Sequence, residues 1–269
     1  MPPPSVNYER APLDGLGEIG HNYPVSALST FVAQIRTVTG PVGPVRHMPD
    51  GTTSLMFRLA GDGSAGLYAL GARTRALYKR ASGSRTLFQV VFRPGGGYPF
   101  LGVPLGNLAD RIVPLRDLWG ARADVVLDQL AAAKTHAQRL AAIERALVER
   151  LRASRAIEPA ALPTVRRALA LLATPATTLG GVAQNLRVSE RHLRRVFFAV
   201  VGLSPKRYAR IVRFQRAVAC ASRGSPQWSQ IAADSGYYDQ AHLCAEFREL
   251  AETSPGGLLR EDATLASHA

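Results

Sequence analysis

Cysteine is scarce in this sequence, with only Cys220 and Cys244 among 269 residues. Two thiols exclude both a disulfide framework and a cysteine cluster for a structural metal. The chain also lacks an apolar run of the roughly 18 residues that a membrane-spanning helix needs. Its first residues, MPPPSVNYER, contain no hydrophobic core of a signal peptide. We therefore expect a cytoplasmic protein with no membrane segment, no metal site and no cofactor.

Acidic residues are outnumbered by basic ones. The 33 lysines and arginines exceed the 20 aspartates and glutamates, which gives a formal net charge of +13 and a pI near 10.6. Such an excess suits a polyanionic partner without identifying it. The excess is uneven, because residues 186–223 contain ten basic side chains and one acidic one, whereas residues 224–269 contain two basic and seven acidic ones. Residues 186–223 therefore favour contact with a polyanion most.

Residues 189–223 predict two helices joined by a tight turn. Ser189 is a suitable N-cap, Gly202 suits a helix end, and Ser204-Pro205 suits the start of the next helix. Apolar and basic side chains recur at helical spacing on two faces of the first helix: Leu193, Val196 and Phe197 on one, and Arg191, Arg194 and Arg195 on the other. One face is therefore suited to burial and the other to negative charge.

An internal repeat surrounds this segment. Both copies contain an alanine, a turn four residues later, a His-Leu pair and a phenylalanine: Ala183, Arg187, His192-Leu193 and Phe197, then Ala232, Gly236, His242-Leu243 and Phe247. The second turn has one more residue than the first, and a Ser-Pro pair follows each copy. A small residue where two helices approach, a turn and a further helix are typical of a helix-turn-helix. The sequence predicts two such units bridged by a long helix from Pro205 to Ser222.

From about Val165 to Arg260 the sequence resembles the DNA-binding domain of AraC/XylS-type transcription regulators. The segments that carry the resemblance are LGGVAQNLRVSERHLRRVF, GLSPKRYARIVRFQRAV, IAADSGYYDQAHLCAEF and the TSP that follows. The resemblance implies a bacterial-type transcription factor that binds double-stranded DNA in a sequence-specific manner and works with the transcription machinery.

The resemblance also implies roles for individual side chains. The family's base-facing positions fall on Arg191, Arg194 and Arg195 in the first recognition helix and on Gln240, Ala241 and Ala245 in the second. Arginine suits O6 and N7 of guanine, and a good bidentate contact contributes ~1–3 kcal/mol of discrimination. Gln240 is the candidate base contact of the second unit. Lys206, Arg207 and Arg210 on the linker helix are better assigned to phosphates, because of their charge and position.

The sequence departs from the family pattern at several positions. A basic residue is common in the family at the positions of Ala245 and Phe198, and a tyrosine is expected where Leu258 stands. The second unit is also acidic. We therefore expect the first helix-turn-helix to dominate affinity and sequence discrimination.

The N-terminal part combines predicted strands with later helices. Residues 52–59, 66–70 and 86–92 are rich in β-branched and aromatic residues, whereas residues 121–130 and 135–151 follow a helical period. Residues 27–38 fit either a helix or a strand. We expect an α+β protein, whose β-rich, barrel-like regulatory domain with supporting helices is similar to the domains that precede such DNA-binding modules. The expected boundaries are 1–153 for this domain, 154–163 for a linker and 164–269 for the all-α double helix-turn-helix.

Two further features of residues 1–153 are open to interpretation. Five side chains are candidates for an effector pocket by residue type alone: Tyr68, Arg73, Tyr78, Arg93 and Tyr98. An apolar stripe is either a homodimer seam or a face that packs on its own β domain: Leu140, Ile143, Leu147 and Leu151. The glycines of residues 95–97 lack the Lys-Ser/Thr of a phosphate loop and favour a hairpin turn.

Two other function classes compete with a signal-controlled regulator. A DNA-tethered enzyme, such as an alkyl-transfer repair protein, needs a nucleophilic cysteine, and residues 1–153 contain none. Their histidines, His21, His47 and His136, form no ligand motif, and no nucleophile elbow is present. We therefore expect no enzymatic activity. The second competitor is a regulator whose N-terminal domain serves only protein interaction or dimerisation, and it stays open.

Overall fold

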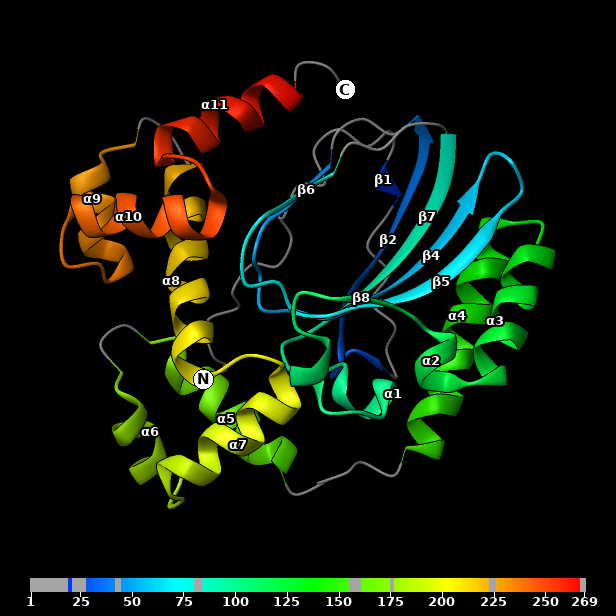
Figure 1. Ribbon diagram of the computed structural model, residues 1–269, viewed down its shortest axis with the longest axis horizontal. Coiled ribbons are helices and arrows are strands. Elements are labelled where there is room, and N and C mark those ends of the chain that lie inside the picture. Colours follow the sequence, from blue (N-terminus) through cyan, green and yellow to red (C-terminus); the bar gives the residue numbers. More distant parts are fainter. Residues whose placement is uncertain are drawn as a thin grey trace.

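In a computed structural model the chain forms an N-terminal antiparallel sheet with supporting helices, followed by an all-helical C-terminal region (Figure 1). This confirms the predicted α+β class. The structure describes residues 19–20, 28–41, 45–79, 84–154, 161–174, 177–222 and 226–266. Most of the predicted linker, at residues 155–160, and His21 lie outside the described residues.

Six of the described strands form one antiparallel sheet in the order β1-β2-β7-β4-β5-β8, and β3 pairs with β6 in a separate ribbon. The strands are β1 (Ile19–Gly20), β2 (Val32–Pro41), β3 (Val45–His47), β4 (Ser54–Ala60), β5 (Ala65–Leu70), β6 (Leu77–Lys79), β7 (Ser84–Phe92) and β8 (Ile112–Pro114). Strand β7 pairs with both β2 and β4. Its Phe88, Val90, Val91 and Phe92 are all buried. The strand expected at residues 86–92 therefore lies in the interior of the sheet, between β2 and β4.

The two faces of the sheet differ in polarity, because side chains alternate along each strand. On one face Phe57 of β4 lies opposite Phe88 of β7. On the other face Gln89 of β7 lies opposite Met56 of β4 and Arg36 of β2. The first face requires an apolar cover, and the second is polar.

Helices follow the sheet in sequence: α1 (Tyr98–Leu101), the 3-10 helix η3 (Leu105–Leu108), α2 (Arg116–Trp119), α3 (Ala121–Ala132) and α4 (His136–Ala153). Helices α3 and α4 lie together against the apolar face of the sheet (Figure 1). Helix α4 begins with a capping box, in which Thr135 Oγ1 accepts from the Gln138 amide and Gln138 Oε1 accepts from the Thr135 amide.

The structure corrects the dimer interpretation of the α4 stripe. Leu140, Ile143 and Leu147 are buried in the core of their own chain, and Leu151 is half-buried against the same core. The four side chains face the sheet because their helical spacing matches its apolar face. They are not available as a seam between two copies.

The structure decides two further predictions, one for residues 27–38 and one for the loop at residues 95–97. Within residues 27–38, which fitted either a helix or a strand, β2 begins at Val32. Residues 95–97 form no hairpin turn, because they enter α1 directly. This loop packs closely against the chain before β2, since a side chain at Gly96 would meet the carbonyl oxygen of Phe31 at 2.3 Å.

The C-terminal helices are α5 (Ala161–Leu172), α6 (Leu179–Asn185), α7 (Glu190–Val201), α8 (Pro205–Ala221), α9 (Trp228–Ser235), α10 (Gln240–Ala251) and α11 (Pro255–Ala266). Helix α5 begins at Ala161, inside the expected linker, and α7 and α8 are the two helices expected after Ser189. The predicted caps are confirmed. Ser189 Oγ accepts from the His192 amide at 3.1 Å, and Ser204 Oγ accepts from the Arg207 amide at 3.3 Å. Gly202 ends α7 at a φ of 87°, in the left-handed region that favours glycine.

The buried apolar residues form two clusters. One is continuous from the sheet and α3–α4 through η3 to α5–α7 and the first half of α8. The other joins the second half of α8 to α9, α10 and α11, with Met48 packed against it. The first helix-turn-helix thus shares its core with the N-terminal sheet, whereas the second has a core of its own.

Candidate nucleic-acid interface

Both helix-turn-helix units form the same turn. Arg187 after α6 and Gly236 after α9 adopt positive φ values of 54° and 83°. In each unit the next amide donates back to the alanine of the first helix: Val188 to Ala183 at 3.0 Å, and Tyr237 to Ala232 at 2.9 Å. Because the turns are the same, α7 and α10 are equivalent: each is the second helix of its own unit.

The three arginines of α7 are exposed, while Leu193, Val196 and Phe197 on its other face are buried. Arg194 is paired with Glu190 one turn earlier, with 2.5 Å between Nη2 and Oε2. Arg195 Nη2 lies 3.4 Å from His192 Nδ1. The exposed Arg194–Glu190 ion pair is weak, so Arg194 can exchange this partner for a polyanion.

The basic residues of α8 divide into two groups. Lys206 and Arg207, in its first turn, are exposed. Arg210, one turn later, is held by two carboxylates of α10: its Nε donates to Glu246 Oε1 at 2.6 Å and its Nη2 donates to Glu249 Oε2 at 2.6 Å. The structure therefore gives Arg210 a contact between helices in place of a free cation, and leaves Lys206 and Arg207 as candidates for phosphate contacts.

The second recognition helix presents a different surface. Gln240 is its first residue and is exposed, and Asp239 caps the helix by accepting from the His242 amide at 2.7 Å. Where the two copies are aligned on their leucine and phenylalanine, the three arginines of α7 correspond to small side chains: Ala241, Cys244 and Ala245. At these three positions, therefore, only the first unit carries long cationic side chains.

Charge and burial are unusual between α8 and α10. Glu246 is 5% exposed and Arg213 Nη2 donates to its Oε1 at 3.1 Å, in addition to the bond from Arg210. The hydrogen bonds that Arg210 donates to the Glu249 carboxylate raise the pKa of Arg210 and lower the pKa of Glu249. Burial and the nearby Glu246 carboxylate raise the pKa of the Tyr237 phenol. These shifts favour the charged forms of Arg210 and Glu249 and the neutral form of the Tyr237 phenol.

The N-terminal domain contacts both units. At the end of α7, a side chain at Gly202 would lie 3.0 Å from the carbonyl oxygen of Leu105, so η3 and this turn meet through backbone. At the end of α10, the Ala76 amide donates to the Leu250 carbonyl at 2.7 Å, and the Tyr78 hydroxyl donates to the Ala251 carbonyl at 2.7 Å. The sheet domain thus bridges the two recognition helices.

The five candidates for an effector pocket do not come together. Tyr68 lies on the polar face of the sheet and Tyr98 is buried in α1, while β6 with Tyr78 lies well apart from α1 (Figure 1). Arg73 Nη1 donates to the Asp110 carbonyl at 3.2 Å, and Arg93 Nε donates to the Ser29 carbonyl at 2.9 Å. The structure therefore does not bring the five side chains into one pocket, because residue type alone does not specify the face or the loop on which a side chain lies.

A polar group that the sequence analysis missed lies on the second face of the sheet. Arg36 of β2 and Gln89 of β7 are cross-strand neighbours, and Gln89 Nε2 donates to Ser54 Oγ at 3.0 Å. Burial lowers the pKa of Arg36 and raises that of the nearby Asp50. The alternation of polar and apolar residues in Val32–Val38 is the signal that identifies this face.

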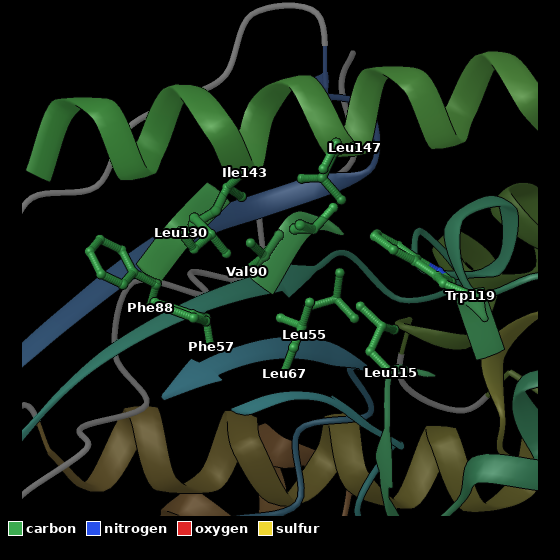
Figure 2. Close-up of a pocket in the computed structure, with 12 residues that line it drawn as sticks. Leu55, Phe57, Leu67, Phe88, Val90, Leu115, Trp119, Leu130, Ile143 and Leu147 are labelled. Atoms are coloured by element: carbon green, nitrogen blue, oxygen red, sulfur yellow. The ribbon is translucent and has the colours of Figure 1, made fainter. Parts of the chain in front are cut away.

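An apolar cavity lies on the opposite face, between the sheet and helices α2–α4 (Figure 2). Phe57 and Phe88 point toward it from the strands, and Ile143 and Leu147 point toward it from α4. Its free volume is about 20 Å³, which is close to the room that one water molecule requires. Because its lining is apolar, it provides no partners for a bound water.

Two absences apply to the described part of the chain. There, histidine, cysteine, aspartate and glutamate side chains do not gather in groups of three that could hold a metal ion. Among the described helices, none combines the length and apolar character that crossing a membrane requires.

Comparison with known families matches two parts of the chain. Residues 182–261 match a helix-turn-helix domain family, and residues 21–114 match a family described as a domain of unknown function, DUF6597. A search of curated proteins finds no significant match. The first match spans α6 to α11, which includes both recognition helices.

Several solved structures are similar to parts of this chain. A transcriptional regulator from Chromobacterium violaceum with an AraC-type DNA-binding domain is 24% identical, with a TM-score of 0.35, and the match covers 40% of this chain and 96% of that one. The C-terminal domain of AraT, a response regulator from Geobacillus stearothermophilus, is 23% identical over 40% and 88% of the two chains, with a TM-score of 0.35. ToxT from Vibrio cholerae is 10% identical over 84% and 96%, with a TM-score of 0.43.

Proposed function

From the AraC-type helix-turn-helix domain that residues 182–261 form, we propose that this protein is a sequence-specific DNA-binding regulator of transcription. The observation that supports the proposal best is the doubled helix-turn-helix with an exposed arginine face on α7. Such helices enter the major groove, where base edges are distinguishable. The proposal assigns the protein no enzymatic activity.

The two units have unequal shares in DNA recognition. In this proposal Arg191, Arg194 and Arg195 contact guanine edges, while Lys206 and Arg207 contact the backbone phosphates. In the second unit Gln240 is the candidate base contact, suited to N6 and N7 of adenine. Since the remaining equivalent positions of α10 are small, the first unit contributes most of the sequence discrimination.

Selection from a library of randomised duplexes by the purified full-length chain tests this function. The expected result is enrichment of one sequence motif, with an affinity that falls as salt rises. A protein that enriches no motif, or whose affinity for duplex DNA is independent of salt, contradicts the proposal.

A signal at the N-terminal domain can reach the recognition helices through the domain contacts. Because η3 meets the end of α7 and β6 meets the end of α10, any shift of the sheet domain changes their relative orientation. A signal must interact differently with two arrangements of these contacts in order to regulate binding. The polar face that contains Arg36 and Gln89 is the candidate place for a small polar effector.

The competing role for this domain is protein interaction without a small ligand. Thermal unfolding of the full chain against a set of small polar metabolites separates the two, because a ligand of the folded state raises its midpoint in proportion to RT ln(1 + [L]/Kd). A shift that Arg36→Gln abolishes supports the effector. No shift with any compound favours the interaction module.

A further inference from the structure

Both units pack on α8 through apolar side chains, and the second unit adds charged contacts. With the copies aligned at Leu193/Leu243 and Phe197/Phe247, Glu246 occupies the position of Val196. Both positions are buried, at 5% and 1% exposure. The first unit therefore has an apolar side chain at a place where the second has a carboxylate, which requires partners in order to be buried.

Two arginines of α8 supply the partners of Glu246. Arg210 Nε donates to Glu246 Oε1 at 2.6 Å and Arg213 Nη2 donates to the same oxygen at 3.1 Å. Arg210 also donates two hydrogen bonds to the Glu249 carboxylate, from Nη1 at 3.1 Å and from Nη2 at 2.6 Å. The guanidinium of Arg213 lies 4.9 Å from the centre of the Tyr237 ring, which belongs to the turn before α10.

These contacts differ from apolar packing in one physical respect. Guanidinium–carboxylate hydrogen bonds are directional, and the one to Glu249 is bidentate. They therefore fix both the rotation of α10 about its own axis and its position along α8. Apolar contacts are not directional and tolerate small shifts. The N-terminal end of α10 carries Gln240, and the orientation of α10 therefore sets where this side chain meets a second major groove.

We propose that Glu246 is a positioning residue that fixes the second recognition helix on the linker helix and thereby sets the half-site spacing that the protein accepts in DNA. The inference rests on the proposed function. Buried polar groups that specify register in helical assemblies provide the physical precedent. Glu246 contacts no DNA in this scheme and acts through Arg210 and Arg213.

The test uses the full chain and the duplex that wild type enriches from the randomised library. A series of duplexes adds or removes one or two base pairs between the two half-sites, and a truncated duplex contains only the first half-site. Wild type is expected to lose about tenfold in affinity or more for each changed base pair. Glu246→Gln is expected to lose about threefold or less, and to bind the first half-site as wild type does.

Two further variants make the result interpretable. Glu246→Val introduces the side chain of the first unit and is expected to relax the spacing preference in the same way as Glu246→Gln. Glu252→Gln changes the net charge equally at an exposed position outside the cluster, and is expected to keep the wild-type preference. A relaxed preference in Glu252→Gln would show that charge alone is responsible, and would overturn the inference.

The remaining outcomes separate this inference from the proposed function. If wild type enriches no duplex, both fail together. If wild type selects a two-part site and both Glu246 variants keep its spacing preference, only the inference fails. If the variants lose affinity for the first half-site as well, Glu246 supports the fold and does not position the second helix.

Discussion

Individual side chains on α7 differ in their surroundings. Arg194 is paired with Glu190, Arg195 lies beside His192, and Arg191 is exposed at the start of the helix. Contacts between exposed ions contribute little in water, so their loss on DNA binding costs little. The arginines are therefore available for base edges, although the free protein gives them local partners.

The first prediction compares the two units at single residues. Arg195→Ala is expected to lower the affinity for the selected duplex by about tenfold to 100-fold, the loss of one bidentate contact of ~1–3 kcal/mol. Gln240→Ala is expected to cost less. Fluorescence anisotropy with both variants on the same duplex measures the difference. A larger loss for Gln240→Ala would contradict the dominance of the first unit.

The second prediction concerns the Tyr237 phenol. Its pKa is raised above the usual value of 10.0, mainly by burial. The folded state therefore retains its proton at a pH where the unfolded chain loses it, so this contribution to stability is present below pH 10.0 and is lost as pH rises above it. Urea unfolding between about pH 9 and 11 is expected to show a steeper loss for wild type than for Tyr237→Phe. Equal slopes would contradict the shift.

Helices α4 and α8 are each held by an apolar face rather than by a single contact. Helix α4 lies on the apolar face of the sheet through Ile143 and Leu147, beside a cavity of about 20 Å³ (Figure 2). Helix α8 packs on the first unit with Tyr208 and Ile211 and on the second with Phe214 and Ala217. One helix thus supports two units that have separate cores.

The third prediction tests the packing of α4. Leu147→Ala enlarges an existing cavity at a position that is 1% exposed, and is expected to lower the free energy of unfolding by about 2–5 kcal/mol. Val125→Ala on the exposed side of α3 is the matched control, with an expected change within about 0.5 kcal/mol. Urea denaturation of both variants measures the difference. A small effect at Leu147 would indicate that the helix is not held by this face.

In the molecule as a whole, positive charge is concentrated in residues 186–223. The two apolar cores are joined by α8. The N-terminal domain contacts the first unit through η3 and the second through β6. Movement of either unit therefore requires that contacts with the sheet domain rearrange. DNA binding and the state of the N-terminal domain are coupled by this arrangement if the two units reorient on DNA.

The fourth prediction concerns the salt dependence of DNA binding by the whole chain. Each phosphate contact is expected to add about −0.9 to the slope of log affinity against log salt. Lys206→Ala is expected to reduce the magnitude of that slope by about one unit without changing the selected sequence. Lys134→Ala removes the same charge from the loop before α4 and is expected to leave the slope unchanged. Equal slopes for the two variants would exclude a phosphate contact at Lys206.

Much of the helical region follows from local signals in the sequence. Ser189 and Ser204 are caps, Gly202 is a left-handed helix end, and the spacing of Leu193 and Phe197 gives the buried face of α7. These properties depend on neighbours within one or two turns, so the order of residues alone determines them. The sequence was also sufficient for the central strand β7, because residues 86–92 are rich in β-branched and aromatic residues.

Only the tertiary structure decided which distant groups meet. Nothing in the sequence pairs Arg210 with Glu246, 36 positions away, because the choice between a phosphate and a carboxylate depends on how α8 and α10 cross. The same holds for the α4 stripe, whose spacing is equally compatible with a second chain or with the sheet, and for short elements such as β6 that contain too few residues for a period. Local order therefore determined the helices and their exposed arginines, and long-range packing determined what those helices rest on.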